Sequence, residues 1–135
     1  MRPSFLWLFA AAIGLLSAPA GRAQEKPAYD VRAAFAQADR NGDGVVDREE
    51  FIERTVEVFY AADTNKDGYL SPEELERGVV YSQEFKQVDR NGDGRVSLAE
   101  FLWARDRLFD ETDTNTDGVL ELDEVVNMYE KKVGK

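Results

Sequence analysis

The chain of 135 residues contains no histidine and no cysteine. Without histidine it lacks the commonest general base and the commonest imidazole ligand for metals. Without cysteine it lacks thiol nucleophiles, disulfides and thiolate metal sites. Any metal site must therefore use oxygen ligands, which suit hard cations such as Ca²⁺ and Mg²⁺.

Basic residues are also scarce. Lys and Arg number 17 against 27 Asp and Glu, so the net charge is −10. A protein that binds nucleic acid normally presents a basic face. We therefore predict that the chain has no nucleic-acid partner.

The sequence has one long apolar run, FLWLFAAAIGLL at residues 5–16. Arg2 precedes this run, and the small residues SAPAGRA follow it. That order is typical of a secretory signal peptide. Twelve helical residues reach only about 18 Å, which is too short for a membrane span. We predict a signal peptide over residues 1–23, cleaved after Ala23 or Ala20, then a flexible leader over residues 24–30. The mature protein would be exported, periplasmic or extracellular, and free of the membrane.

The rest of the chain is built of repeats. Four twelve-residue segments begin with Asp-x-Asn-x-Asp-Gly and end with Glu: DRNGDGVVDREE at 39–50, DTNKDGYLSPEE at 63–74, DRNGDGRVSLAE at 89–100 and DTNTDGVLELDE at 113–124. We call them loops one to four. Loops one and three share one opening string and loops two and four share another, so a unit of about 50 residues occurs twice.

These segments resemble the calcium loop of the EF-hand superfamily at every diagnostic position. The resemblance covers about residues 31–133 and is strongest to small secreted EF-hand proteins of bacterial type. It implies an all-α domain over residues 31–135, made of helix–loop–helix repeats with short shared helices between the loops and short β-bridges between paired loops. It also implies up to four bound Ca²⁺ ions.

Calcium prefers about six to eight oxygen ligands, and a loop supplies them from positions 1, 3, 5, 7, 9 and 12. Gly at position 6 allows the sharp turn between them, position 7 offers its backbone carbonyl, and Glu at position 12 offers two oxygens. The predicted ligands are Asp39, Asn41, Asp43, Val45, Asp47 and Glu50; Asp63, Asn65, Asp67, Tyr69, Ser71 and Glu74; Asp89, Asn91, Asp93, Arg95, Ser97 and Glu100; and Asp113, Asn115, Asp117, Val119, Glu121 and Glu124.

Helical signals flank each loop. A Phe lies four residues before every loop, and an apolar residue follows every closing Glu, so an incoming and an outgoing helix would each have a buried face. Positions 9 and 12 of the first three loops form capping-box patterns, whereas Glu121 is a weak N-cap. The apolar residues are Phe35, Phe59, Phe85 and Phe109 before the loops, and Phe51, Leu75, Phe101 and Val125 after them.

The spacing departs from ordinary EF-hand pairs. Only residues 51–62 separate loops one and two, and residues 101–112 separate loops three and four, so each stretch resembles one amphipathic helix. Such a helix would hold two loops about 18 Å apart. Two predictions follow: loop one pairs with loop three and loop two with loop four, or a kinked helix restores pairing of consecutive loops. Residues 75–88 would be a hinge at Gly78 or one long helix.

Charge ranks the loops. Loops one and four carry four acidic side chains at ligand positions, and loops two and three carry three, with Lys66 and Arg95 also inside them. We therefore expect sites one and four to bind calcium more tightly.

Calcium binding itself leaves two roles open. A calcium buffer or store needs no partner, whereas a sensor exposes an apolar face to a protein partner when calcium binds. Met128 is the only Met after the apolar start, and adaptable sensor grooves are Met-rich, which favours the buffer. The acids are accounted for as ligands and no catalytic motif is present, so we predict no enzyme. No sequence feature identifies a protein partner.

Overall fold

The computed structural model describes residues 30–78 and 82–133, so the predicted signal peptide and most of the leader lie outside the described residues. The fold is all-α, and no helix in these two segments is long and apolar enough to cross a membrane. The elements are α1 (Val31–Ala38), β1 (Val45–Asp47), α2 (Arg48–Ala62), β2 (Tyr69–Leu70), α3 (Pro72–Gly78), α4 (Ser82–Val88), β3 (Val96–Ser97), α5 (Leu98–Thr112), β4 (Val119–Glu121) and α6 (Leu122–Val133).

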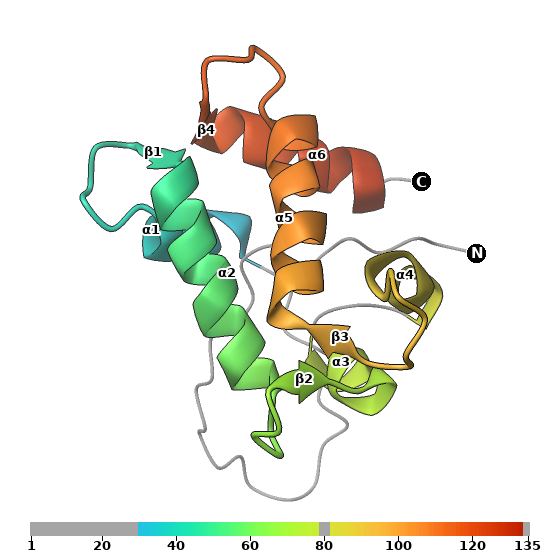
Figure 1. The fold of residues 1–135 in the computed structure, drawn as a ribbon. Helices are drawn as coiled ribbons and strands as arrows, with labels where there is room; N and C mark the ends of the chain where they lie inside the picture. The colour runs from blue at the N-terminus through green and yellow to red at the C-terminus, as the bar shows by residue number, and fades with distance from the viewer. Residues whose placement is uncertain (1–29, 79–81, 134–135) are drawn as a thin grey trace, which may run out of the picture.

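The four strands of the described segments form two short antiparallel pairs, one at each end of the molecule (Figure 1). β1 pairs with β4, so that Val46 lies opposite Leu120. β2 pairs with β3, so that Leu70 lies opposite Val96. Loop one therefore lies beside loop four, and loop two lies beside loop three.

Both predictions of loop pairing are wrong, and the helices explain why. α2 runs for 15 residues without a break and holds loops one and two at its opposite ends, about 22 Å apart, which excludes pairing of loop one with loop two. α5 does the same for loops three and four. The chain turns back through α3 and α4, so loop three begins at the end of the molecule where loop two finishes, and α2 and α5 are antiparallel (Figure 1).

The segment between loops two and three contains two helices, so the prediction of one long helix over residues 75–88 is wrong. α3 ends at Gly78 and α4 begins at Ser82, while residues 79–81 lie outside the described residues. α3 and α4 pack against each other. Interior Gly is unfavourable in a helix, which agrees with a helix end at Gly78.

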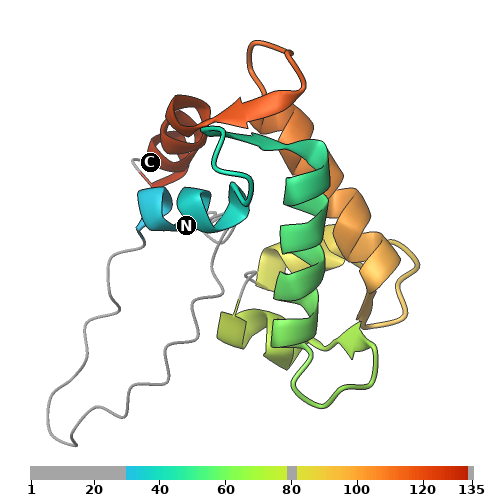
Figure 2. The ribbon, with the colours of Figure 1, turned by 90° about the vertical axis from the view of Figure 1, so that its left-hand side faces the viewer.

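The helices form two layers. α2 and α5 lie side by side in one layer, and the pairs α1–α6 and α3–α4 lie behind them at the two ends (Figure 2). Each end has its own hydrophobic core. The first core contains Val31, Ala34, Phe35, Ala38, Val46, Phe51, Leu108, Phe109, Leu120 and Val125, and the second contains Val58, Phe59, Ala62, Leu70, Leu75, Phe85, Val88, Val96 and Phe101.

The cores mix residues from the two copies of the repeat. Phe51 of the first copy meets Phe109 of the second, with ring centroids 5.2 Å apart. Phe59 and Phe101 meet in the other core at 5.7 Å. Adding or subtracting 50 converts one pair into the other, so the molecule has an approximate two-fold axis between α2 and α5. The predicted burial of the flanking Phe and apolar residues is confirmed at all eight positions.

The N-terminal caps of the helices hold the ends of the loops. Asp47 and Glu50 form the predicted capping box at the start of α2, and Ser97 and Glu100 form the one at α5. Ser71 and Glu74 exchange the same two hydrogen bonds, at 3.0 and 3.2 Å. These caps direct the position-12 carboxylates back into their loops.

Candidate metal centre

The first Asp of each loop folds the backbone around itself. Asp39 Oδ1 accepts a hydrogen bond from the Asp43 N–H at 3.2 Å, and Asp39 Oδ2 accepts one from the Gly44 N–H at 3.0 Å. The same two bonds recur in loops two, three and four, with distances between 2.9 and 3.2 Å. All four loops therefore have one backbone conformation, in which position 1 faces the inside of the turn.

Positions 3 and 5 continue the wrapping. In loop one, Asn41 Oδ1 accepts from the Asp43 N–H at 2.8 Å, and Asp43 Oδ1 accepts from the Val45 N–H at 3.1 Å. Equivalent bonds occur in the other three loops. Three alternate side chains thus direct oxygen atoms toward the inside of each turn.

The turn at position 6 needs glycine. Gly44, Gly68, Gly94 and Gly118 all have φ between 82° and 88°. That is the left-handed region, which glycine enters without a Cβ clash. The same region is used at position 4, where loops one and three have Gly42 and Gly92, whereas loops two and four place Lys66 and Thr116 at φ 58° and 60°.

The closing Glu of each loop is buried and reaches across to the loop's start. Glu50 is 7% exposed, and its Oε1 accepts from the N–H groups of Arg40 and Asn41, at 3.0 and 3.1 Å. Its Oε2 accepts from the Asp47 N–H at 3.2 Å. Glu74, Glu100 and Glu124 repeat this arrangement at positions 2, 3 and 9 of their loops.

In loops two, three and four these contacts favour the charged form of the closing carboxylate. The N–H groups of Ser71 and Asn65, together with the Thr64 hydroxyl, lower the pKa of Glu74 to about 2 although burial opposes the shift. For Glu100 burial is the largest influence and raises the pKa, but the donors from Ser97 and its neighbours outweigh it and the net shift is downward. Glu124 behaves in the same way. Loops two, three and four thus close on a carboxylate whose pKa is lowered in a partly enclosed site, which suits a cation.

Loop four shows how strongly the negative charges interact. Burial, together with the charges of Asp117, Glu124 and Asp113, raises the pKa of Glu121. The Asn115 amide also donates to Glu121 Oε2 at 3.1 Å, which places position 9 beside position 3. A divalent cation at this position would relieve the repulsion between the carboxylates.

The oxygen donors fit calcium in chemistry. Each loop brings two or more carboxylates, an Asn amide oxygen and a position-7 carbonyl to one turn, and Ca²⁺ uses these ligand types. No group of three or more Asp, Glu, His or Cys side chains in residues 30–78 and 82–133 forms a metal site by itself. Each predicted donor set contains three or four acidic side chains together with an amide and a carbonyl oxygen, and its acidic members do not form such a group within these segments.

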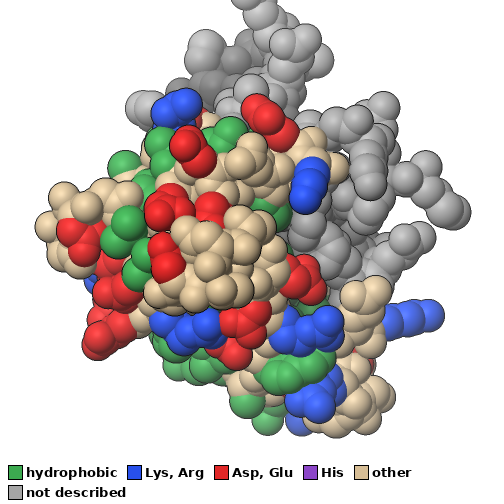
Figure 3. Space-filling view, turned by 90° about the horizontal axis from the view of Figure 1, so that it is seen from above, with side chains coloured by type: hydrophobic (Ala, Val, Ile, Leu, Met, Phe, Trp, Pro, Cys, Tyr) green, Lys and Arg blue, Asp and Glu red, His purple; other side chains and the backbone are tan. Residues whose placement is uncertain are grey.

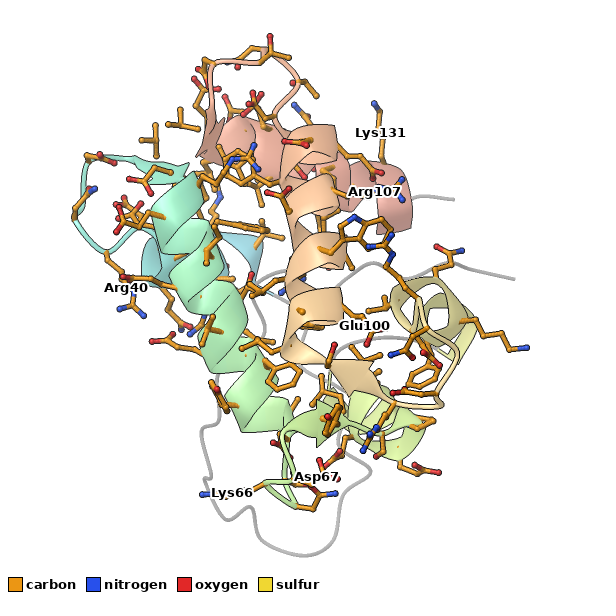
Figure 4. All side chains as sticks on the ribbon, in the orientation of Figure 1. Arg40, Lys66, Asp67, Glu100, Arg107 and Lys131 are labelled. Carbon is orange, nitrogen blue, oxygen red and sulfur yellow. The ribbon has the colours of Figure 1, made fainter. Side chains whose placement is uncertain are left out.

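The predicted ligands at positions 1, 3 and 5 lie in the four turns, and those at position 12 lie in the first turn of the helix that follows each loop. Position 7 lies at or next to the start of each strand, and position 9 lies at the strand end or just after it. Acidic side chains are spread over the end of the molecule that carries loops one and four (Figure 3). Glu100 lies at the base of α5, and Lys66 projects from the tip of loop two (Figure 4).

Position 2 contributes contacts that the sequence analysis did not predict. In loops two and four, the hydroxyls of Thr64 and Thr114 donate to the closing Glu, each at 2.9 Å. In loop one, Arg40 instead forms ion pairs with Glu53 and Glu57 of α2. Position 2 alternates between Arg and Thr along the four loops, and this alternation is the sequence pattern from which the contacts could have been predicted.

A second unpredicted set of contacts links the two long helices. Arg48 at the start of α2 pairs with Asp106 and with Asp110 of α5, the latter at 2.6 Å. Arg105 is 8% exposed and lies near the rings of Phe51 and Phe101, between the two cores. These residues tie α2 of the first copy of the repeat to α5 of the second, and the equivalent position to Arg48 in the second copy is Leu98.

Comparison with known proteins agrees with this geometry. A family model described as EF hand matches residues 31–53, 55–80 and 83–102, which contain loops one, two and three with flanking helical residues. No curated protein matches the chain. Loop four lies outside the matched residues but repeats the hydrogen bonds of the other three. Since these matches cover half of the sequence and the fold has the expected helices and strand pairs, the chain belongs to the EF-hand family, whose domains bind calcium.

Proposed function

We propose that the protein binds up to four calcium ions, one in each loop, through the oxygen atoms at positions 1, 3, 5, 7, 9 and 12. The observation that carries the proposal is the common hydrogen-bond pattern of the four turns, in which a buried Glu carboxylate closes each loop onto its second and third residues. Glu at position 12 would bind the ion with two oxygens, and Asp at position 1 would supply a carboxylate oxygen.

The neighbouring residues Glu49 and Glu50 provide a matched test. Glu50 is buried inside loop one, whereas Glu49 is exposed. Both changes remove one negative charge, and Gln preserves the capping-box pattern at position 12. Calorimetric titration should therefore show four sites for the native protein and for Glu49→Gln, and three sites at the same calcium concentrations for Glu50→Gln. Equal stoichiometry in the two variants would refute the ligand assignment.

We further propose that the protein acts as an exported calcium buffer or store. The large apolar side chains support this role, because among the described residues only Ile52 and Tyr60 are prominently exposed, at 41% and 59%. The two cores are otherwise packed within the molecule, and no catalytic role is needed. EF-hand domains are typically calcium-binding rather than enzymatic.

The alternative is a sensor that exposes an apolar face to a protein partner when calcium binds. Ile52 and Tyr60 are its strongest support, because they lie eight residues apart on α2 and share one side of it. A dye that fluoresces on apolar surfaces separates the roles. A buffer should give little change between chelator and saturating calcium, whereas a sensor should give a large rise with calcium.

Export is a separate part of the proposal, supported by the order of basic, apolar and small residues in residues 1–23. The mass of the mature protein recovered from its host tests it. Loss of residues 1–23 or 1–20 is expected, and recovery of the full chain inside the cell would contradict export.

A further inference from the structure

The strand pairing sorts the four loops by charge. β1 and β4 join loops one and four, each with four acidic side chains at ligand positions. β2 and β3 join loops two and three, each with three. The two more acidic loops therefore share one half of the molecule, and the two less acidic loops share the other. Neither pairing considered from the sequence would have produced this separation.

The less acidic half also contains a basic residue that touches both of its loops. Arg95, at position 7 of loop three, has its Nε 3.3 Å from Oδ2 of Asp93, a candidate ligand at position 5. Its guanidinium carbon lies 3.7 Å from the centre of the Tyr69 ring, at position 7 of loop two. The corresponding residues in the other half are Val45 and Val119, which carry no charge.

We propose that the four calcium sites form two unequal pairs, in which loops one and four bind tightly and loops two and three bind more weakly, and that Arg95 adds to this difference. This inference rests on the proposed calcium function. It names the pairs and assigns an affinity-determining residue that is not itself needed as a side-chain ligand, because position 7 contributes a backbone carbonyl.

The electrostatic reason follows from these contacts. A guanidinium beside Asp93 neutralises part of the negative charge that attracts the cation, and it repels a divalent ion in the same turn. At ~8 Å in a solvent-like medium, a unit charge and a divalent ion interact by about the amount that changes an affinity fivefold. Because the guanidinium also covers Tyr69, loop two shares the repulsion with loop three.

Titration with calcium, followed by nuclear magnetic resonance, can resolve the four sites separately. In the native protein, the glycines of loops one and four should respond at lower calcium concentration than those of loops two and three. The probes are the backbone amide signals of Gly44, Gly68, Gly94 and Gly118.

Three substitutions test the role of Arg95. Arg95→Val, which copies the residue of loops one and four, should lower the midpoint for loops two and three roughly fivefold and leave loops one and four unchanged. Val45→Arg is the reverse change, since Val45 occupies the position of Arg95 in the other copy of the repeat, and it should weaken loops one and four. Arg107→Gln removes the same charge from the exposed side of α5, where Arg107 stacks on Trp103, and should leave the order of the midpoints unchanged.

The possible outcomes distinguish a failure of the proposed calcium function from a failure of the proposed role of Arg95. If no loop responds to calcium, the proposed function fails. If all four loops respond but loops two and three fill first, or if Arg95→Val shifts their midpoint no more than Arg107→Gln does, the function stands and this inference is wrong.

Discussion

A disulfide between strands β1 and β4 would test which loops pair. Val46 and Leu120 lie opposite each other in the antiparallel pair and are fully buried. Residues opposite each other in such a pair have Cα atoms about 4.5 to 5.5 Å apart, which is within the range that a disulfide bridges. The chain has no cysteine, so the double variant Val46→Cys/Leu120→Cys would contain only this pair of thiols.

The expected stabilisation can be estimated from the length of chain that the bond encloses. Positions 46 and 120 enclose about 75 residues, for which the loop-entropy relation gives roughly 4.5 kcal/mol at 25 °C. Strain in the bond and residual structure in the unfolded chain commonly reduce this gain, so we expect about 2–4 kcal/mol. Comparing the oxidised and reduced forms of one variant cancels the loss from replacing two buried side chains.

The assay is urea unfolding in the presence of a calcium chelator, after oxidation has been verified by mass. The matched control is Val46→Cys/Val96→Cys, which would join loops one and three. Loop three lies beside loop two, at the other end of α2 from loop one, so the two positions are separated by about the 22 Å length of that helix, far beyond the reach of a disulfide. The reasoning is refuted if the control closes within one molecule while the 46–120 pair remains reduced.

Three further predictions concern the loops and the core. Replacing Lys66, which has a left-handed backbone, by Asn should raise the free energy of unfolding without calcium by roughly 0.5–1 kcal/mol, since Asn tolerates this region better. A lower unfolding free energy for the variant, measured by chemical denaturation, would contradict the assignment of strain to Lys66. The pKa of Glu74 is lowered to about 2 from its ordinary value of 4.5, so its contribution to stability is complete above about pH 4.5 and lost as the pH falls toward 2. In acid titration of the calcium-free protein, Glu74→Gln should therefore lose less unfolding free energy over that range than the native protein does. An equal loss in the two proteins would contradict the role assigned to Glu74. Phe59→Ala should lower the unfolding free energy by about 3–5 kcal/mol, because Phe59 is 1% exposed in the second core, and exposed Tyr60→Ala is the control, expected to lose much less in urea unfolding.

Local chemistry made the loops predictable. Gly at position 6 is required by the left-handed turn, and alternate Asp, Asn and Asp side chains point into that turn whatever the rest of the fold does. The helix ends were also local, because Asp47 and Ser97 cap helices through hydrogen bonds within three residues. The buried Phe residues followed from helical spacing on either side of each loop.

The contacts of position 2 and of Arg48 were harder to predict from the sequence. The hydroxyls of Thr64 and Thr114 reach a Glu ten residues later, and this contact exists only once the loop has closed. Arg48 meets Asp106 and Asp110 across two helices that are far apart in the sequence. Spacing within one helix cannot reveal such a contact, because it depends on which helices are neighbours and on their relative direction.

The sequence by itself determined the four oxygen-rich turns, the helices between them and the faces that those helices bury. It left the direction of packing open, because α2 and α5 would bury the same apolar faces whether they ran parallel or antiparallel. Only the tertiary structure decided this: α3 and α4 return the chain at one end, and Phe51 then packs on Phe109 and Phe59 on Phe101. That choice places the more acidic loops together in one half and Arg95 between the two others, so the difference proposed between the calcium pairs is a consequence of long-range packing.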